Sequence, residues 1–126
     1  MSYISITQAG SDHTEWLKNL DFYKEEVDIL RNRLAEIANK NTSFEARQGI
    51  EHFENQFIVQ RNNIDELNHA IREYASKMGH ESLQHAGHIE KKLNGEHNSL
   101  KDQYETFEKT FNELRREFNQ YLSKWM

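Results

Sequence analysis

The sequence predicts an all-α fold, an elongated up-down-up three-helix bundle with coiled-coil-like heptad packing. Large apolar residues recur at alternating spacings of three and four along three separate stretches, the a/d pattern of helices that share a seam. The 126 residues include no proline, which would interrupt long helices. Hydrophobic residues make up 36% of the chain and charged residues 29%, a balance that suits narrow apolar stripes on polar helices.

Each seam is a series of mostly large side chains. The first consists of His13, Trp16, Leu20, Tyr23, Val27, Leu30, Leu34 and Ile37. The second consists of Ile50, Phe53, Phe57, Gln60, Ile64, Leu67, Ile71, Tyr74 and Met78. The third consists of His97, Leu100, Tyr104, Phe107, Phe111, Leu114, Phe118, Tyr121 and Trp125. Aromatic side chains bury much area per residue, so the seams can form a core despite the polar composition.

The first helix is expected over residues 12–39. Asp12 can accept hydrogen bonds from the free amides of the first turn, and Glu15 follows three residues later, as in a capping box. Residues 1–10 are expected to form a flexible N-terminal lead. The rest of the chain, 11–126, forms a single helical domain in this interpretation.

The second helix is expected over residues 43–78. The Asn-Lys-Asn sequence at 39–41 breaks the first helix, and Thr42 with Glu45 repeats the capping signature. Gly49 lies early in this helix and is expected to weaken it by about 0.5–1 kcal/mol relative to alanine.

A histidine-rich linker over residues 79–95 is expected to precede the third helix, over 96–125. Gly79 is a natural left-handed helix terminator, and two more glycines and three histidines follow it before residue 96. An alternative is one helix over about 82–125, because the seam phase extends backward through Leu93. We favour the linker, because it makes the first and third helices nearly equal, about 42 Å each at 1.5 Å per residue.

Composition excludes several classes of function. The absence of cysteine removes disulfides, thiolate zinc sites and cysteine nucleophiles. The formal net charge is −5 and no basic stripe is present, which argues against nucleic-acid binding. No segment resembles a signal peptide or a membrane span, so we expect a cytoplasmic protein without a membrane partner. No catalytic residue is assigned, because no nucleophile-and-base pair and no phosphate-binding loop is recognisable.

A histidine cluster is the candidate metal site. His13 and His97 each begin a seam, so parallel first and third helices bring them to one level. His69 and Glu66, three residues apart on the second helix, are expected near that level, and His88 lies in the linker at the same end. Imidazole and carboxylate ligands suit zinc or non-haem iron.

The third helix carries the candidate interface, because its aromatic strip is large enough to remain partly uncovered by two partner helices. The interface residues are Phe107, Phe111, Phe118, Tyr121 and Trp125. On the second helix, Gln60 interrupts the seam. It is expected to fix the register of the helices or to form a polar layer with Tyr23 or Tyr104.

These observations support two hypotheses of function. The first is a non-enzymatic bundle that acts through helix-mediated association, either with a protein partner or with itself as a homo-oligomer. The second is a zinc- or iron-binding bundle with its histidine cluster at one end; the first hypothesis needs no cofactor.

Overall fold

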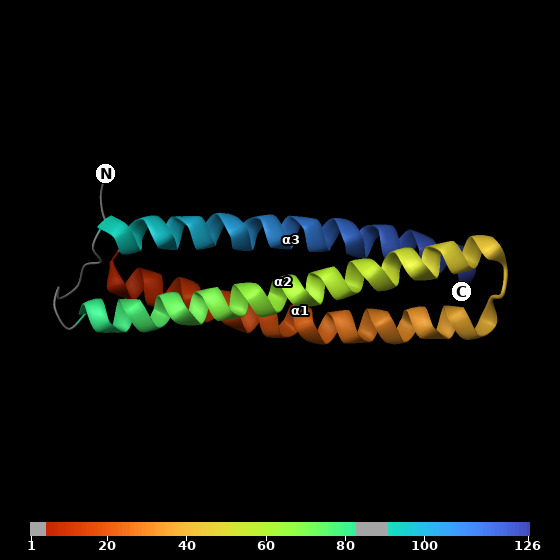
Figure 1. Ribbon diagram of the computed structural model, residues 1–126, viewed down its shortest axis with the longest axis horizontal. Helices are drawn as coiled ribbons and strands as arrows, with labels where there is room; N and C mark the ends of the chain where they lie inside the picture. The colour runs from red at the N-terminus through yellow and green to blue at the C-terminus, as the bar shows by residue number, and fades with distance from the viewer. Residues whose placement is uncertain (1–4, 83–90) are drawn as a thin grey trace.

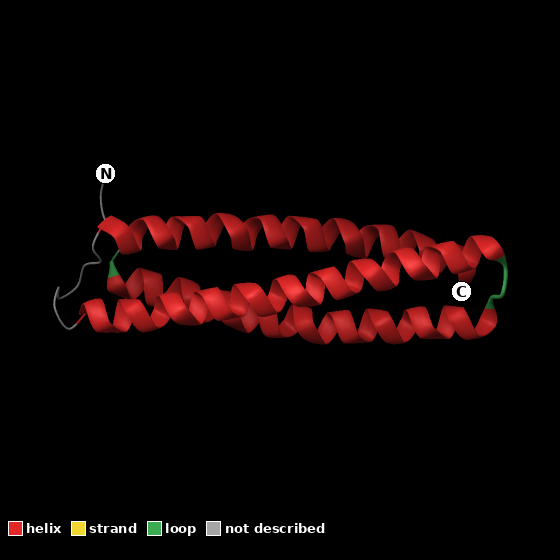
Figure 2. Ribbon diagram, in the orientation of Figure 1, coloured by secondary structure: helices red, strands yellow, loops and turns green. Residues whose placement is uncertain are grey.

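A computed structural model describes residues 5–82 and 91–126 of the chain, which form three α-helices. Helix α1 spans Ile6–Lys40, α2 spans Phe44–Ser82 and α3 spans Lys91–Trp125. Figure 1 shows the helices side by side in an elongated rod, with α1 and α3 running in one direction and α2 in the other. Figure 2 shows how helix dominates the described residues. The predicted up-down-up three-helix bundle is confirmed.

The core consists of the predicted seams. Leu20, Val27, Phe57, Phe111 and Phe118 are fully buried, and most of the other seam residues are buried with them. The positions at the ends of the seams, such as Ile50, Tyr121 and Trp125, are only partly buried. The heptad spacing therefore identifies the residues that hold the helices together.

Helix α1 begins earlier than the sequence indicates. Ser5 is the N-cap, and its hydroxyl accepts a hydrogen bond from the Gln8 amide at 3.1 Å. Ala9 is fully buried and extends the seam by one step toward the N-terminus. Residues 6–10 are therefore helical rather than a flexible lead, and Asp12 is not the cap.

Helix α2 also exceeds its predicted bounds. Ser43, rather than Thr42, caps it, because the Ser43 hydroxyl accepts from the Ala46 amide at 3.2 Å. The helix continues through Gly79 to Ser82, since glycine permits a helix to end but does not force it to.

The predicted linker 79–95 is therefore too long, because α3 begins at Lys91. Leu93 and Asn94 are buried, so the first turns of α3 already pack against the bundle. The alternative of one helix over about 82–125 depends on residues 83–90, which lie outside the described residues.

Gly49 has a packing role that the sequence interpretation missed. A Cβ atom at this position would lie 2.1 Å from Cε1 of Tyr121, so the tyrosine ring occupies the space that a side chain would need. The Tyr121 hydroxyl donates a hydrogen bond to the carbonyl oxygen of Ala46 at 2.6 Å. The glycine thus allows the end of α3 to lie closely on the start of α2.

In neither 5–82 nor 91–126 does a helix combine the length and apolar composition needed to cross a bilayer.

Candidate functional site

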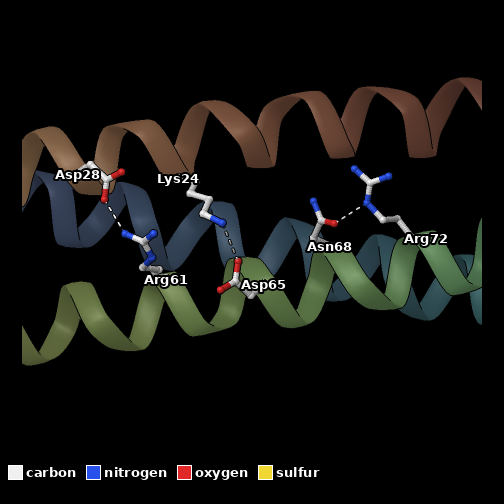
Figure 3. Close-up of polar contacts among 6 residues, drawn as sticks. All are labelled: Lys24, Asp28, Arg61, Asp65, Asn68 and Arg72. Carbon is white, nitrogen blue, oxygen red and sulfur yellow. Dashed lines mark hydrogen bonds and ion pairs between the residues drawn. The ribbon is translucent and has the colours of Figure 1, made fainter.

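The interface of α1 with α2 is bordered by ion pairs between the two helices. The pairs are Lys24–Asp65 at 3.3 Å, Arg61–Asp28 at 2.6 Å and Arg31–Glu54 at 4.0 Å. Figure 3 shows the first two of these pairs bridging the helices. All six side chains are at least a third exposed, so each pair contributes little stability and mainly favours one antiparallel register.

The interface of α1 with α3 contains a polar network near its centre. Asn19 donates its side-chain amide to the Tyr104 hydroxyl at 2.9 Å. The hydroxyls of Tyr104 and Tyr23 both donate to Oε2 of Glu108, at 3.0 and 2.7 Å. Burial raises the pKa of Tyr23 to about 12 and also raises the pKa of Tyr104, so both phenols stay protonated and can donate.

One heptad further along this interface, Arg115 binds Glu26. Its Nε and one terminal nitrogen donate to the two carboxylate oxygens of Glu26, and its other terminal nitrogen donates to Asn112 at 2.6 Å. The guanidinium also lies over the Phe111 ring, 5.1 Å from its centroid. The fork geometry makes this the most directional bond between α1 and α3.

At the N-terminal end of α3, His97 is sandwiched between side chains of the other helices. Its ring stacks on Trp16 at 5.1 Å and lies 5.6 Å from Tyr74. Nε2 is 3.0 Å from Oδ2 of Asp12. Because a carboxylate only accepts, Nε2 carries the hydrogen, and Nδ1 of the neutral ring is a buried acceptor without a partner.

Burial lowers the pKa of His97 below its usual value of 6.5, while the hydrogen bond to Asp12 opposes the shift. Burial also lowers the pKa of His13, and neighbouring His97 lowers it further. Protonation of His97 would create a second N–H with no acceptor in a buried position, which explains why the neutral form is favoured.

The structure brings only part of the predicted metal cluster together. His13 and His97 lie at the same end and both approach Tyr74. His69 is 79% exposed and lies 3.9 Å from Glu73 on its own helix, and Glu66 is also exposed. His88 lies outside the described residues. In the described parts of the chain, no group of three or more histidine or acidic side chains is arranged to hold a metal ion.

The aromatic strip of α3 is packed within the chain. Phe107, Phe111 and Phe118 are at most 5% exposed, whereas Tyr121 and Trp125 are partly exposed. Phe107 meets the Tyr23 ring edge-on, and Phe118 meets Phe57 in the same way. Helices α1 and α2 therefore cover most of the central part of the strip, and the partly exposed residues lie at its C-terminal end.

A groove with a volume of about 580 Å³ lies between α2 and α3. Its buried floor consists of Gln60, Leu67 and Phe107. Its exposed or half-buried rims consist of Asn63, Glu66 and Ala70 on α2 and of Asp102, Gln103, Thr106 and Thr110 on α3. No residue of α1 lines it, so the groove opens on the side of the bundle away from α1.

A second cavity of about 210 Å³ continues this groove toward the N-terminal end of α3. The two cavities share Ala70 and Gln103. Tyr74 and Leu100 are the buried residues of the second cavity. We call the combined depression, from Gln60 to Lys77 along α2, the α2–α3 groove.

The groove floor contains polar atoms that the chain itself leaves unsatisfied. Gln60 is 2% exposed, and its side-chain oxygen has no hydrogen-bond partner. The Tyr74 hydroxyl is buried and also unpartnered. The polar layer predicted for Gln60 with Tyr23 or Tyr104 is wrong, because those tyrosines bind Glu108 on the other face of the bundle.

The rims of the groove are acidic. Glu66 and Asp102 lie on opposite rims, and among the described residues neither forms an ion pair. Lys77 is the one cation lining either cavity, and it is already paired with Glu96 at 3.4 Å. Along the groove, the described parts of α2 and α3 share no side-chain hydrogen bond besides this terminal pair.

The sequence interpretation missed the polar partners that lie beside the seams, above all Asn19, Glu26, Glu108 and Arg115. A signal was present, because Asp12, Asn19 and Glu26 recur at heptad spacing and so do Glu108 and Arg115. Residues at such positions flank a shared seam and meet across it. The groove had no comparable signal, since its shape depends on the relative placement of α2 and α3.

No family model, curated protein or solved structure matches this chain.

Proposed function

We propose that this protein acts by helix-mediated association with another protein, as a binding module without a reaction of its own, and that the α2–α3 groove is its contact surface. The supporting observation is that polar contacts bridge the cavities of the bundle unequally. A cavity of about 480 Å³ between α1 and α2 is lined by the ion-paired Asp28, Arg31 and Glu54, whereas among the described residues no ion pair crosses the middle of the α2–α3 groove. Cross-helix ion pairs border α1–α2, and a hydrogen-bonded network closes α1–α3. Between α2 and α3 the floor of buried seam residues lies under a groove of about 580 Å³.

The groove suits a protein better than a small ligand. It is open along its length, and its rims carry short side chains, such as Ala70 and Thr106, and flexible polar ones, such as Gln103. Small-molecule sites are mostly enclosed and apolar with a few convergent polar groups. A helix laid along two others buries its apolar face on the seam residues below it.

Two matched variants test the proposal. Thr106→Trp fills the groove, whereas Asn98→Trp adds the same ring at an exposed position of α3 outside it. Both variants and the natural chain are immobilised, after circular dichroism has shown the same helix content, and incubated with extract. The captured proteins are quantified by mass spectrometry, and light scattering of each free chain gives its mass.

A protein that the natural chain and Asn98→Trp retain, and Thr106→Trp loses, is the expected result. A natural chain that is a dimer, with Thr106→Trp monomeric, would identify the associating protein as a second copy. The proposal is contradicted if the natural chain is a monomer and retains no protein that Thr106→Trp loses.

A further inference from the structure

We infer that the α2–α3 groove binds an amphipathic α-helix whose apolar seam is flanked by Lys and Arg, and that this helix completes a four-helix bundle. The inference rests on the proposed function and names the chemistry of the partner. The length of the groove, the residues of its floor and the charge of its rims lead to this inference.

The length of the groove fits a helix of several turns. From Gln60 to Lys77 it follows α2 for about 25 Å, at 1.5 Å per residue. The side chains on its rims are small at Ala70 and Ser99, where an incoming helix must approach closely. In Figure 1, α2 and α3 run antiparallel beside each other. A further helix can lie along the groove between them in the way that helices of bundles pack.

Buried seam residues form the floor of the groove. Leu67, Phe107 and Leu100 line it from below, and each is 5–7% exposed. Gln60 lines the same floor, and its buried side-chain oxygen has no hydrogen-bond partner, which costs free energy.

The acidic charge of the rims indicates which residues should flank the apolar seam of the partner helix. Glu66 lines the groove from α2 and Asp102 lines it from α3, and Glu73 extends the acidic rim of α2. Basic residues beside the seam of an incoming helix meet these carboxylates, as e and g residues do in coiled coils. A second copy docked groove to groove would instead set carboxylates against carboxylates, so the charge favours a different, basic helix.

Two synthetic peptides of equal length test the inference. Both carry one Leu/Ala seam at heptad spacing, and they differ only in having Lys/Arg or Glu flanks. Fluorescence anisotropy with the full chain measures binding of each. The basic peptide is expected to bind at least about tenfold more tightly, with affinity falling as salt is raised.

Charge reversal separates a groove from general attraction to an acidic protein. The double variant Glu66→Lys/Asp102→Lys reverses the rims, and Glu25→Lys/Glu36→Lys makes the same charge change on exposed positions of α1. We expect the groove variant to lose the basic peptide and to gain the Glu-flanked peptide, while the α1 variant keeps the natural preference. Amide chemical shifts should move along 60–77 and 96–110.

Equal weakening by the two double variants would show nonspecific attraction and overturn the inference. So would failure of the basic peptide to bind, or tighter binding of the acidic peptide. Each of these results leaves the proposed function intact if Thr106→Trp still abolishes capture of a natural protein, because that capture does not depend on basic flanks.

Discussion

Gly49 illustrates how one residue can have opposite effects on a helix and on a fold. Alanine favours helix over glycine by about 0.5–1 kcal/mol. At position 49, however, the added methyl group would overlap the Tyr121 ring. Overpacking of this kind costs about 1–3 kcal/mol. We therefore expect Gly49→Ala to lower the free energy of unfolding by about 1 kcal/mol, measured by urea denaturation.

Two controls test this explanation. Gly95→Ala, at a helical position with nothing within 4 Å of the new Cβ, should raise stability by about 0.5–1 kcal/mol. In a Tyr121→Ser background, Gly49→Ala should become stabilising, because the ring that opposes it is gone. Destabilisation that persists without the ring would refute the steric account.

The buried pair His97–Asp12 makes stability depend on pH. Burial lowers the pKa of His97 and of His13 in the folded chain, whereas the unfolded chain takes up these protons near pH 6.5. The unfolded state therefore binds more protons as the pH falls below about 6.5, and this part of the stability is lost. Above that pH the contribution is fully present. Asp12, Tyr74 and Lys101 are the other titratable groups around the ring.

Denaturant unfolding between pH 7.5 and 5 should show this loss, with a slope of at most about 1.4 kcal/mol per pH unit for each histidine. His97→Gln should reduce the slope, because glutamine does not titrate. His69→Gln, at a position that is 79% exposed, should keep the natural slope. Identical slopes in the natural chain and His97→Gln would show that His97 is not the group responsible.

Among the elements, α1 and α3 owe their parallel register to polar residues beside the seam. Asp12 meets His97, Asn19 meets Tyr104 and Tyr23 meets Glu108, always 85 residues apart. A constant offset is required of two parallel helices with the same heptad period. The sequence predicted the seams that create this interface. It did not identify the partners, because one sequence does not say which flank of each helix faces the other.

The ion pair between Glu26 and Arg115 should contribute more to the free energy of unfolding than the exposed ion pairs between α1 and α2. Both of its side chains are about two thirds buried, and its geometry is bidentate. Glu26→Gln should lower the free energy of unfolding by about 1–2 kcal/mol, since Arg115 loses its opposite charge and one of its two hydrogen bonds to residue 26.

The matched comparison is Asp28→Asn, which removes the carboxylate of an exposed pair and should cost less than about 1 kcal/mol. Thermal and urea unfolding of both variants, measured together, give the two differences. Equal effects would mean that burial and geometry do not distinguish these ion pairs.

For the molecule as a whole, periodicity was enough to predict the topology but not the candidate site. Three amphipathic stretches joined by short connections must pack with alternating directions, which sets the bundle. The helix ends were harder to predict, because Ser5 and Gly79 are weak signals whose outcome depends on packing at Ala9 and Leu93. The groove depends on how the side chains of α2 and α3 pack in the assembled chain, which periodicity alone does not give.

The overall shape gives the last prediction. With α2 39 residues long, the rod extends about 58 Å at 1.5 Å per residue. A monomer of this shape should have a radius of gyration of about 18 Å, whereas a compact globule of the same length would have about 14 Å. Small-angle X-ray scattering in dilute solution distinguishes them. Because the seams are buried within one chain, we expect a forward scattering intensity that corresponds to the mass of one chain. A radius of gyration near 14 Å would contradict three helices of this length lying side by side.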